Sequence, residues 1–228
     1  MPSYLITGTS RGLGLGFVTE LLKNPDNVVI ATARDPAKSS GLQELKAKHG
    51  DGQLHLVSLD VTEPDSVHSA AEAAQKLLPN GLDYLISNAG VNYSPLKSLD
   101  ELDMDDFKAE MEFNVTSPMY LFREFSPLVR KSSVKKIMVL SSALGSLSSA
   151  GPTWAPVMPT RLPRLRSTCY VGATDMGAGI GKWIAENIPD LPSLSTETSC
   201  SGCLKVLHDS TPDYNGLFFS HDGTKCPW

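Results

Sequence analysis

Short apolar runs of strand length alternate with helix-length segments between Tyr4 and Ser141, and this alternation constrains the fold more than any other feature. The apolar runs are Tyr4–Thr7, Val28–Ala33, Leu54–Leu59, Tyr84–Ser87 and Ile137–Ser141. They are apolar throughout, as is typical of parallel strands that helices cover on both faces. The helix-length segments are Leu13–Leu22, Leu42–His49, Ser66–Leu78 and Asp103–Val129. The alternation predicts an α/β fold with a Rossmann-type, doubly wound parallel sheet.

The regular pattern stops near Ser148. Residues 149–167 hold four prolines and three arginines, and no helix tolerates that proline spacing. We therefore expect residues 150–173 to be irregular and one helix–strand unit of the sheet to be missing there. Further along the chain, Ser195–His208 has the pattern of an amphipathic helix, and Gly216–Ser220 is predicted to be the final strand.

Charge and hydropathy exclude some classes of partner. The formal net charge of −5, with no lysine/arginine block, argues against nucleic acid. No apolar run reaches the roughly 18 residues that a membrane span requires. Because the first residues pass directly into a strand, we expect no leader peptide and a cytoplasmic protein.

A glycine-rich turn follows the first strand directly. Residues 7–14 read Thr-Gly-Thr-Ser-Arg-Gly-Leu-Gly and lead into the helix-length segment Leu13–Leu22. Glycines in such a turn let the backbone approach a pyrophosphate, whose charge the helix N-terminus stabilises. The placement between strand and helix favours this interpretation over a tight turn without a ligand. We therefore expect residues 1–228 to form a single NAD(P)-binding domain.

The end of the second strand bears on the choice between NAD and NADP. An acidic residue at that position binds the ribose 2′-hydroxyl of NAD, whereas an arginine accommodates the 2′-phosphate of NADP. The strand ends at Arg34, which Asp35 follows. We therefore expect NADP(H). The alternatives are that Arg34 and Arg11, the arginine of the glycine-rich turn, are only solvated, or that Asp35 selects NAD.

Five motifs, in order along the chain, resemble those of the short-chain dehydrogenase/reductase family. They are the Thr-Gly-x-x-x-Gly-x-Gly turn, Leu59-Asp60-Val61-Thr62, Asn88-Ala89-Gly90, Asn114-Val115 and Ser141-Ser142. The C-terminal Asp222-Gly223 and Pro227-Trp228 resemble the C-factor/sniffer branch of carbonyl reductases. The likeness is close over residues 3–148 and loose over residues 174–228.

The resemblance implies reduction of a carbonyl, or oxidation of an alcohol, by hydride transfer with NADP(H). It also implies a small-molecule substrate and a homodimer or homotetramer. It assigns Ser142 to holding the substrate carbonyl and Asn114 to anchoring a water in a proton relay. The alternative for Ser142 is a hydroxyl that is merely satisfied at a strand end. The turn and the resemblance together give these cofactor-binding candidates: Gly8, Ser10, Arg11, Gly12, Leu13, Gly14, Arg34, Asp60, Val61, Asn88, Ala89, Gly90 and Thr174.

The catalytic Tyr-x-x-x-Lys of the family is missing from its expected place. No lysine stands four residues after Tyr170, and no tyrosine stands four residues before Lys182 or Lys205. One back-translation of Thr160–Cys169, read one base earlier, gives Tyr-Ala-Ala-Ser-Lys-Ala-Ala-Leu-Asn-Met. Our hypothesis is therefore that a frame or splicing change replaced this segment. Two alternatives to an active oxidoreductase stay open: a dinucleotide-binding sensor protein without catalysis, and a truncated gene product that does not fold stably.

Metal and disulfide chemistry have weaker support. Cys200 and Cys203 form a Cys-x-x-Cys, but neither a second ligand pair nor a strand-to-helix turn accompanies it. The acidic run Asp100–Glu112 fits an exposed helix start better than a metal site. We expect no metal.

Overall fold

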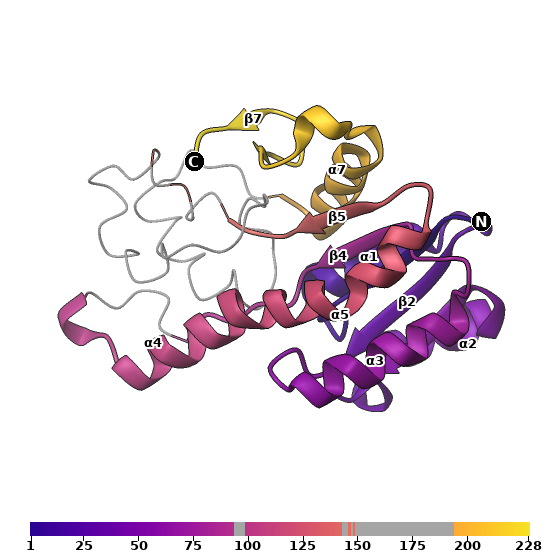
Figure 1. Cartoon of the computed structure of the whole chain (residues 1–228), viewed down its shortest axis with the longest axis horizontal. Helices are drawn as coiled ribbons and strands as arrows, with labels where there is room; N and C mark the ends of the chain where they lie inside the picture. The colour runs from indigo at the N-terminus through magenta and orange to yellow at the C-terminus, as the bar shows by residue number, and fades with distance from the viewer. Residues whose placement is uncertain (94–98, 143–145, 147, 149–193) are drawn as a thin grey trace. The chain divides into compact units, whose positions relative to one another are not determined.

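The computed structural model describes residues 1–93, 99–142, 146, 148 and 194–228. The chain divides into two compact units, which are Met1–Gly90 with Thr116–Met138, and Val91–Val115 with Val139–Trp228. Figure 1 shows the elements of both. The expectation of a single NAD(P)-binding domain stays a prediction. The stretch 150–173, for which we expect irregular structure and a missing helix–strand unit, lies outside the described residues.

The first unit is built on a sheet with the strand order β3-β2-β1-β4-β5. Its strands are β1 (Ser3–Ile6), β2 (Val28–Ala33), β3 (Leu54–Ser58), β4 (Tyr84–Ser87) and β5 (Lys136–Val139). β1 pairs in parallel with β2 on one side and with β4 on the other, and β2 pairs in parallel with β3. The strand order therefore reverses at β1, where open α/β sheets bind ligands beyond the carboxyl ends of the strands. This confirms the predicted Rossmann-type fold.

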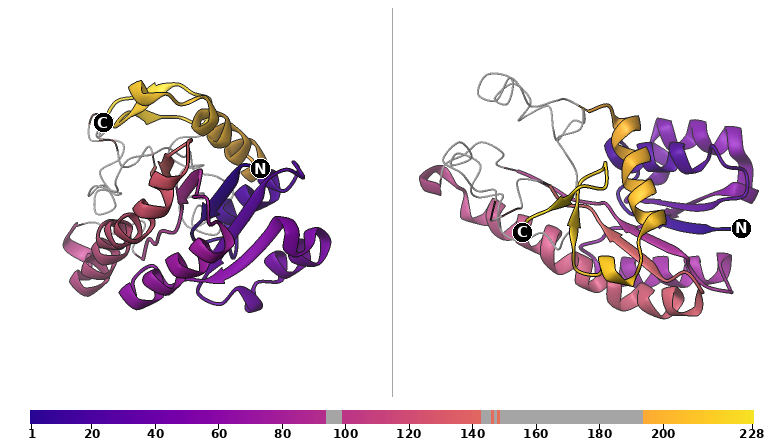
Figure 2. Two further views of the ribbon diagram at one scale, coloured as in Figure 1. Left: turned by 45° about the vertical axis from the view of Figure 1, so that its right-hand side comes forward. Right: turned by 90° about the horizontal axis from the view of Figure 1, so that it is seen from above.

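Four helices flank this sheet in two pairs. They are α1 (Gly12–Leu21), α2 (Ser40–Gln53), α3 (Pro64–Leu77) and α5 (Ser117–Lys131). α1 contacts α2 and α3 contacts α5, and Figures 1 and 2 show α3 and α5 side by side. Right-handed crossovers place each pair on its own face of the sheet. The central strands are buried accordingly, and Leu5, Ile30 and Leu85 are fully inaccessible to solvent.

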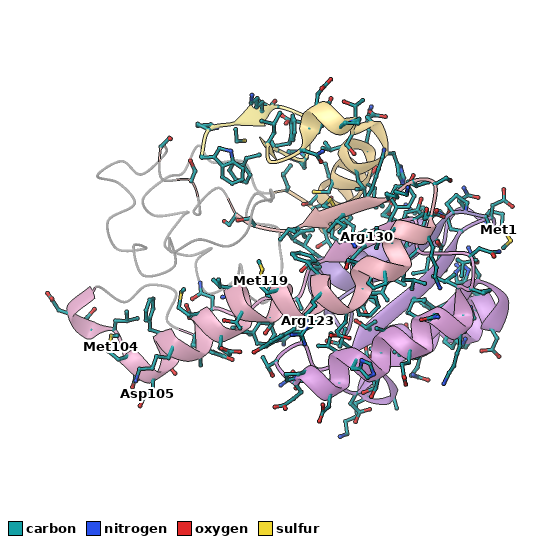
Figure 3. All side chains as sticks on the ribbon, viewed as in Figure 1. Met1, Met104, Asp105, Met119, Arg123 and Arg130 are labelled. Carbon is teal, nitrogen blue, oxygen red and sulfur yellow. The ribbon has the colours of Figure 1, made fainter. Side chains whose placement is uncertain are left out.

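The predicted helical region Asp103–Val129 is interrupted. α4 (Met104–Met111) leads into a π-helical turn over Glu112–Thr116, and α5 follows. The cause is Pro118, which has no N–H for the carbonyl of Asn114 four residues earlier and whose ring crowds it. Asp103 caps α4 by accepting hydrogen bonds from the N–H groups of Asp105 and Asp106. Met104 and Asp105 mark the first turn of α4, while Arg123 and Arg130 lie on α5 (Figure 3).

The second unit contains α4, the helix α7 (Thr196–Asp209) and a short hairpin of β6 (Phe218–Phe219) and β7 (Lys225–Cys226). α7 buries Cys200, Cys203, Leu204 and Leu207, which confirms the predicted amphipathic helix. The final strand expected over Gly216–Ser220 is shorter. Among the described residues its strand partner is β7, antiparallel, rather than the main sheet. The turn at Asp222 and Gly223 brings the two strands together, since Asp222 accepts a hydrogen bond from the Thr224 N–H.

A ring contact and two hydrogen bonds hold the C-terminal residues within the second unit. The rings of Phe218 and Trp228 stack with their centroids 4.9 Å apart. The Ser146 hydroxyl donates to the Pro227 carbonyl at 3.0 Å, and the Ser148 N–H donates to the Trp228 carbonyl at 2.7 Å. No helix in the described part of the chain is long and apolar enough to cross a membrane.

Candidate cofactor and catalytic site

The glycine-rich turn is hydrogen-bonded to the ends of two strands. The Thr7 N–H donates to the Ile86 carbonyl at 3.0 Å, and the Thr9 N–H donates to the Thr32 carbonyl at 2.9 Å. The Thr9 hydroxyl donates to the same Thr32 carbonyl at 3.0 Å. Gly8 has a φ of +70°, which is the left-handed region where glycine carries no steric penalty. The turn is therefore held at the carboxyl ends of β4 and β2.

Two glycines of this turn, Gly8 and Gly14, leave no space for a side chain. A Cβ on Gly14 would lie 2.1 Å from the Gly8 carbonyl oxygen and 2.7 Å from Nδ2 of Asn88. A Cβ on Gly8 would lie 2.9 Å from the Ala89 Cα. The start of α1, the turn and the segment after β4 are thus in direct backbone contact, as close helix–strand packing in this fold requires.

Asn88 and Thr7 join the Asn-Ala-Gly segment to the turn. Nδ2 of Asn88 donates to the Thr7 carbonyl at 2.8 Å and to the Gly8 carbonyl at 3.2 Å. In return, the Thr7 hydroxyl accepts the N–H groups of Asn88 and Ala89, each at 3.0 Å. Our sequence reasoning did not single out Thr7, although its place just before the first glycine of the motif was a signal.

The N-terminus of α1 has the features of an anion site. Its N-cap residue Arg11 is extended and makes no side-chain capping hydrogen bond, and the first turn contains no acidic residue. Both Ser10 and Arg11 are exposed. A helix start with this arrangement suits a bound phosphate, because its N–H groups and dipole favour negative charge.

The segment between β2 and α2 is tied to the glycine turn. Ser39 is buried; its hydroxyl donates to the Ser10 carbonyl at 2.8 Å and accepts the Leu42 N–H at the start of α2. At the other end of the segment, the Arg34 carbonyl accepts the Ser58 hydroxyl at 2.9 Å. The Arg34 side chain is exposed. The structure thus fixes the backbone on both sides of the residues that bear on the choice of cofactor.

Asp35 is engaged by a neighbouring cation. Its carboxylate lies 2.8 Å from Nζ of Lys38, three residues further along the short 3-10 turn Pro36–Lys38. The hydrogen bond to Lys38 lowers the pKa of Asp35, and the same bond raises the pKa of Lys38. Asp35, the residue that left NAD open as an alternative, is therefore already paired.

Asp60 stabilises a local turn. Its Oδ1 accepts the Thr62 N–H at 3.0 Å and the Thr62 hydroxyl at 2.7 Å, while the Asp60 N–H donates to the Ser66 hydroxyl at 2.9 Å. Val61 is buried. The contact of Asp60 and Val61 with adenine, which the family resemblance implies, stays a prediction.

The expected catalytic residues lie in the second unit. Asn114 makes two hydrogen bonds to the backbone of Val91, the residue after Gly90. Its Oδ1 accepts the Val91 N–H at 3.0 Å, and its Nδ2 donates to the Val91 carbonyl at 2.9 Å. Oδ1 of Asn92, the next residue, is buried without a hydrogen-bond partner. Ser142 follows β5 and is half-buried. The catalytic roles of Ser142 and Asn114 stay predictions, and Thr174 lies outside the described residues.

Comparison with known proteins agrees with this geometry. The family model of the short chain dehydrogenases matches residues 3–154. A short chain dehydrogenase of Penicillium aethiopicum is 32% identical to this chain, over an alignment that spans the whole of both chains. The NADPH-bound carbonyl reductase from chicken fatty liver is 28% identical, with a TM-score of 0.83 over 100% of this chain and 99% of that one. The carbonyl reductase Sniffer of Drosophila melanogaster, at 23% identity and a TM-score of 0.80 over the whole of both chains, shares the fold.

The chain therefore belongs to the short-chain dehydrogenase/reductase family, an oxidoreductase family. It is similar to the carbonyl reductases within that family, as the sequence motifs indicate. The alignment with the Penicillium relative extends over 253 positions, whereas this chain has 228 residues. The difference leaves about 25 positions of that alignment with no counterpart in this chain.

Proposed function

We propose that this chain binds NADP(H) at the turn of residues 7–14 and at the segment that begins with Arg34. The observation that carries the proposal is the start of α1, a helix N-terminus with no side-chain cap from Arg11, beside two glycines, Gly8 and Gly14, that have no space for a Cβ. The exposed guanidinium groups of Arg11 and Arg34 supply the positive charge that a 2′-phosphate needs. The NADPH bound to the similar chicken carbonyl reductase supports the same choice.

The family chemistry defines the class of reaction. When bound, NADPH supplies a hydride to a carbonyl carbon, and NADP⁺ accepts one from an alcohol. From the family resemblance, we assign the Ser142 hydroxyl to donating a hydrogen bond to the substrate oxygen, which would orient the carbonyl. The Asn114 side chain holds the backbone at Val91 in place. The substrate class is thus a small carbonyl compound or alcohol.

This chain lacks, at its usual place after the serine, the tyrosine–lysine pair that supplies the proton in the family. In the family, the tyrosine and lysine of the Tyr-x-x-x-Lys motif follow the catalytic serine in the sequence. In this chain the spacing occurs once, at Tyr93 and Lys97, which precede Ser142. Tyr93 is half exposed to solvent, and Lys97 lies outside the described residues. We therefore propose that the chain binds NADP(H) without efficient turnover.

Calorimetric titration of the full chain with NADPH and with NADH tests the binding. We expect NADPH to bind more tightly and to raise the melting temperature, because a ligand of the native state stabilises it. The matched control is Gly14→Ala, whose Cβ would collide with the Gly8 carbonyl. Equal affinity for both cofactors would contradict the NADP assignment. A chain that melts without cooperativity would favour the alternative of a product that does not fold.

A screen of aldehydes and ketones with NADPH consumption as the readout tests the loss of turnover. We expect no consumption above the rate of the Gly14→Ala control. If turnover is found, Tyr93→Phe decides whether Tyr93 supplies the proton. Sequencing the transcript across the codons of Trp154–Met176 tests the frame hypothesis separately, since a shifted base there restores Tyr-x-x-x-Lys, whereas the codons as written exclude it.

A further inference from the structure

We infer that Lys38 determines the cofactor preference by occupying the carboxylate of Asp35, and not by contacting the cofactor. The inference rests on the proposed binding of NADP(H) at this site. A carboxylate at the end of β2 would accept hydrogen bonds from the ribose hydroxyls of NAD and would repel a 2′-phosphate. Asp35 stands two residues beyond that strand end, so what it pairs with decides which cofactor it favours.

The geometry of the segment sets this pair up. Pro36 begins the 3-10 turn Pro36–Lys38 and fixes its backbone, and the Lys38 N–H donates to the Asp35 carbonyl at 3.2 Å. The turn therefore brings Nζ of Lys38 to 2.8 Å from the Asp35 carboxylate. The Ser39 hydroxyl, bonded to the Ser10 carbonyl, then anchors the turn to the glycine-rich motif.

The charges of the segment follow from the pair. Asp35 and Lys38 neutralise each other, so that Arg34 supplies the net positive charge at the end of β2. Removing the Lys38 ammonium would leave the Asp35 carboxylate free, and the segment would be neutral overall. Both side chains are substantially exposed, at 45% for Asp35 and 85% for Lys38, so water screens the effect. At the dielectric constant of water, one added charge beside a phosphate changes its affinity by roughly three- to tenfold.

A double-mutant cycle separates this role from direct contact. Wild type, Lys38→Gln, Asp35→Asn and the double variant are each titrated calorimetrically with NADPH and with NADH. We expect Lys38→Gln to lower the NADPH/NADH affinity ratio by roughly three- to tenfold in the wild-type background. In the Asp35→Asn background, the same substitution should lower the ratio by less than in wild type, because only the loss of the Lys38 charge acts there and no carboxylate remains to be released toward the ribose of NADH.

The matched control is Lys108→Gln. Lys108 forms an equivalent exposed pair with Asp105, three residues away at 2.9 Å on α4, and its loss should leave the ratio unchanged. Melting temperatures without cofactor check that all variants fold.

Two results would overturn the inference. If Lys38→Gln costs the same in both backgrounds, Lys38 binds the phosphate directly. If Lys38→Gln changes nothing in the wild-type background, the pair has no role in specificity. A wild-type chain without preference for NADPH would instead refute the proposed function, and the inference falls with it.

Discussion

Replacing Asn88 tests the link between the cofactor turn and the sheet. Asn88→Ala removes two hydrogen bonds, those from Nδ2 to the carbonyls of Thr7 and Gly8. Each such bond contributes about 1 kcal/mol net, and more when the abandoned acceptor stays dry. We therefore expect the free energy of unfolding to fall by about 2 to 4 kcal/mol. In a chain of this size that corresponds to a melting temperature lower by roughly 4 to 16 °C.

Asn88→Asp is the sharper variant, because it has the same shape but presents only acceptor oxygens when ionised. The introduced carboxylate would face the carbonyl oxygens of Thr7 and Gly8, so at pH 7 this variant should be less stable than Asn88→Ala. The two carbonyls raise the pKa of the introduced carboxyl, since only its protonated form can donate. A group with a raised acid pKa binds its proton more tightly in the folded state, so its stability penalty shrinks as the pH falls.

Urea denaturation of wild type and both variants at pH 7.5 and pH 5 measures these differences. We expect the deficit of Asn88→Asp relative to wild type to be smaller at pH 5, whereas the deficit of Asn88→Ala should stay constant. NADPH affinity should drop in both variants, because the turn loses its support. The reasoning is refuted if Asn88→Asp is as stable as wild type at pH 7.5, or if Asn88→Ala leaves the unfolding midpoint unchanged.

Three further substitutions test other parts of the first unit. His68 on α3 and Glu124 on α5 pair at 3.0 Å, and this contact raises the pKa of His68 and lowers that of Glu124. The pair therefore stabilises most between the ordinary pKa values of about 4.3 for glutamate and 6.5 for histidine, and its contribution is lost as the pH rises through the folded pKa of His68. Glu124→Gln should reduce this contribution to the difference in urea midpoint between pH 6 and pH 8, while Glu72 still raises the pKa of His68. Lys135 has a φ of +56°, so Lys135→Gly should raise the free energy of unfolding by about 0.5 kcal/mol, whereas Lys135→Ala should not. The Asp83 carboxylate accepts hydrogen bonds from the N–H and hydroxyl of Ser3 and from the Ser132 hydroxyl, so Asp83→Ala should cost about 3 kcal/mol in denaturant titrations.

The sheet was predictable because its strands are apolar over their whole length. Val28–Ala33 and Tyr84–Ser87 have the predicted bounds, and the remaining strands of the sheet differ by one or two residues at one or both ends. The break between α4 and α5 was not predicted, because helical periodicity does not register the carbonyl that Pro118 leaves without a partner. The pairing of β6 was missed for a different reason. Its partner β7 has two residues, which is too short to stand out as a pattern.

Within the candidate site, the sequence located the glycine turn and Asn88 but not the contacts that join them. Motif spacing identifies residue types, whereas the roles of Thr7 and Ser39 depend on hydroxyls that reach residues more than 25 positions away. The ion pair of Asp35 with Lys38 spans only three residues, yet the same letters would also fit two solvated side chains. Local geometry, not composition, distinguishes the two cases.

If NADP(H) binds as proposed, the start of α1 would make the cofactor a component of the folded protein. Arg11 provides no side-chain cap at this helix start, and the phosphate of a bound cofactor would accept hydrogen bonds there. Each tenfold excess of NADPH over its dissociation constant then adds about 1.4 kcal/mol to the free energy of unfolding. The share of this chain that escapes degradation in a cell should therefore follow the supply of NADPH. NADP⁺ and NADPH carry the same phosphate groups, so even without turnover the abundance of this chain would report the total amount of NADP(H) in the compartment in which it is made.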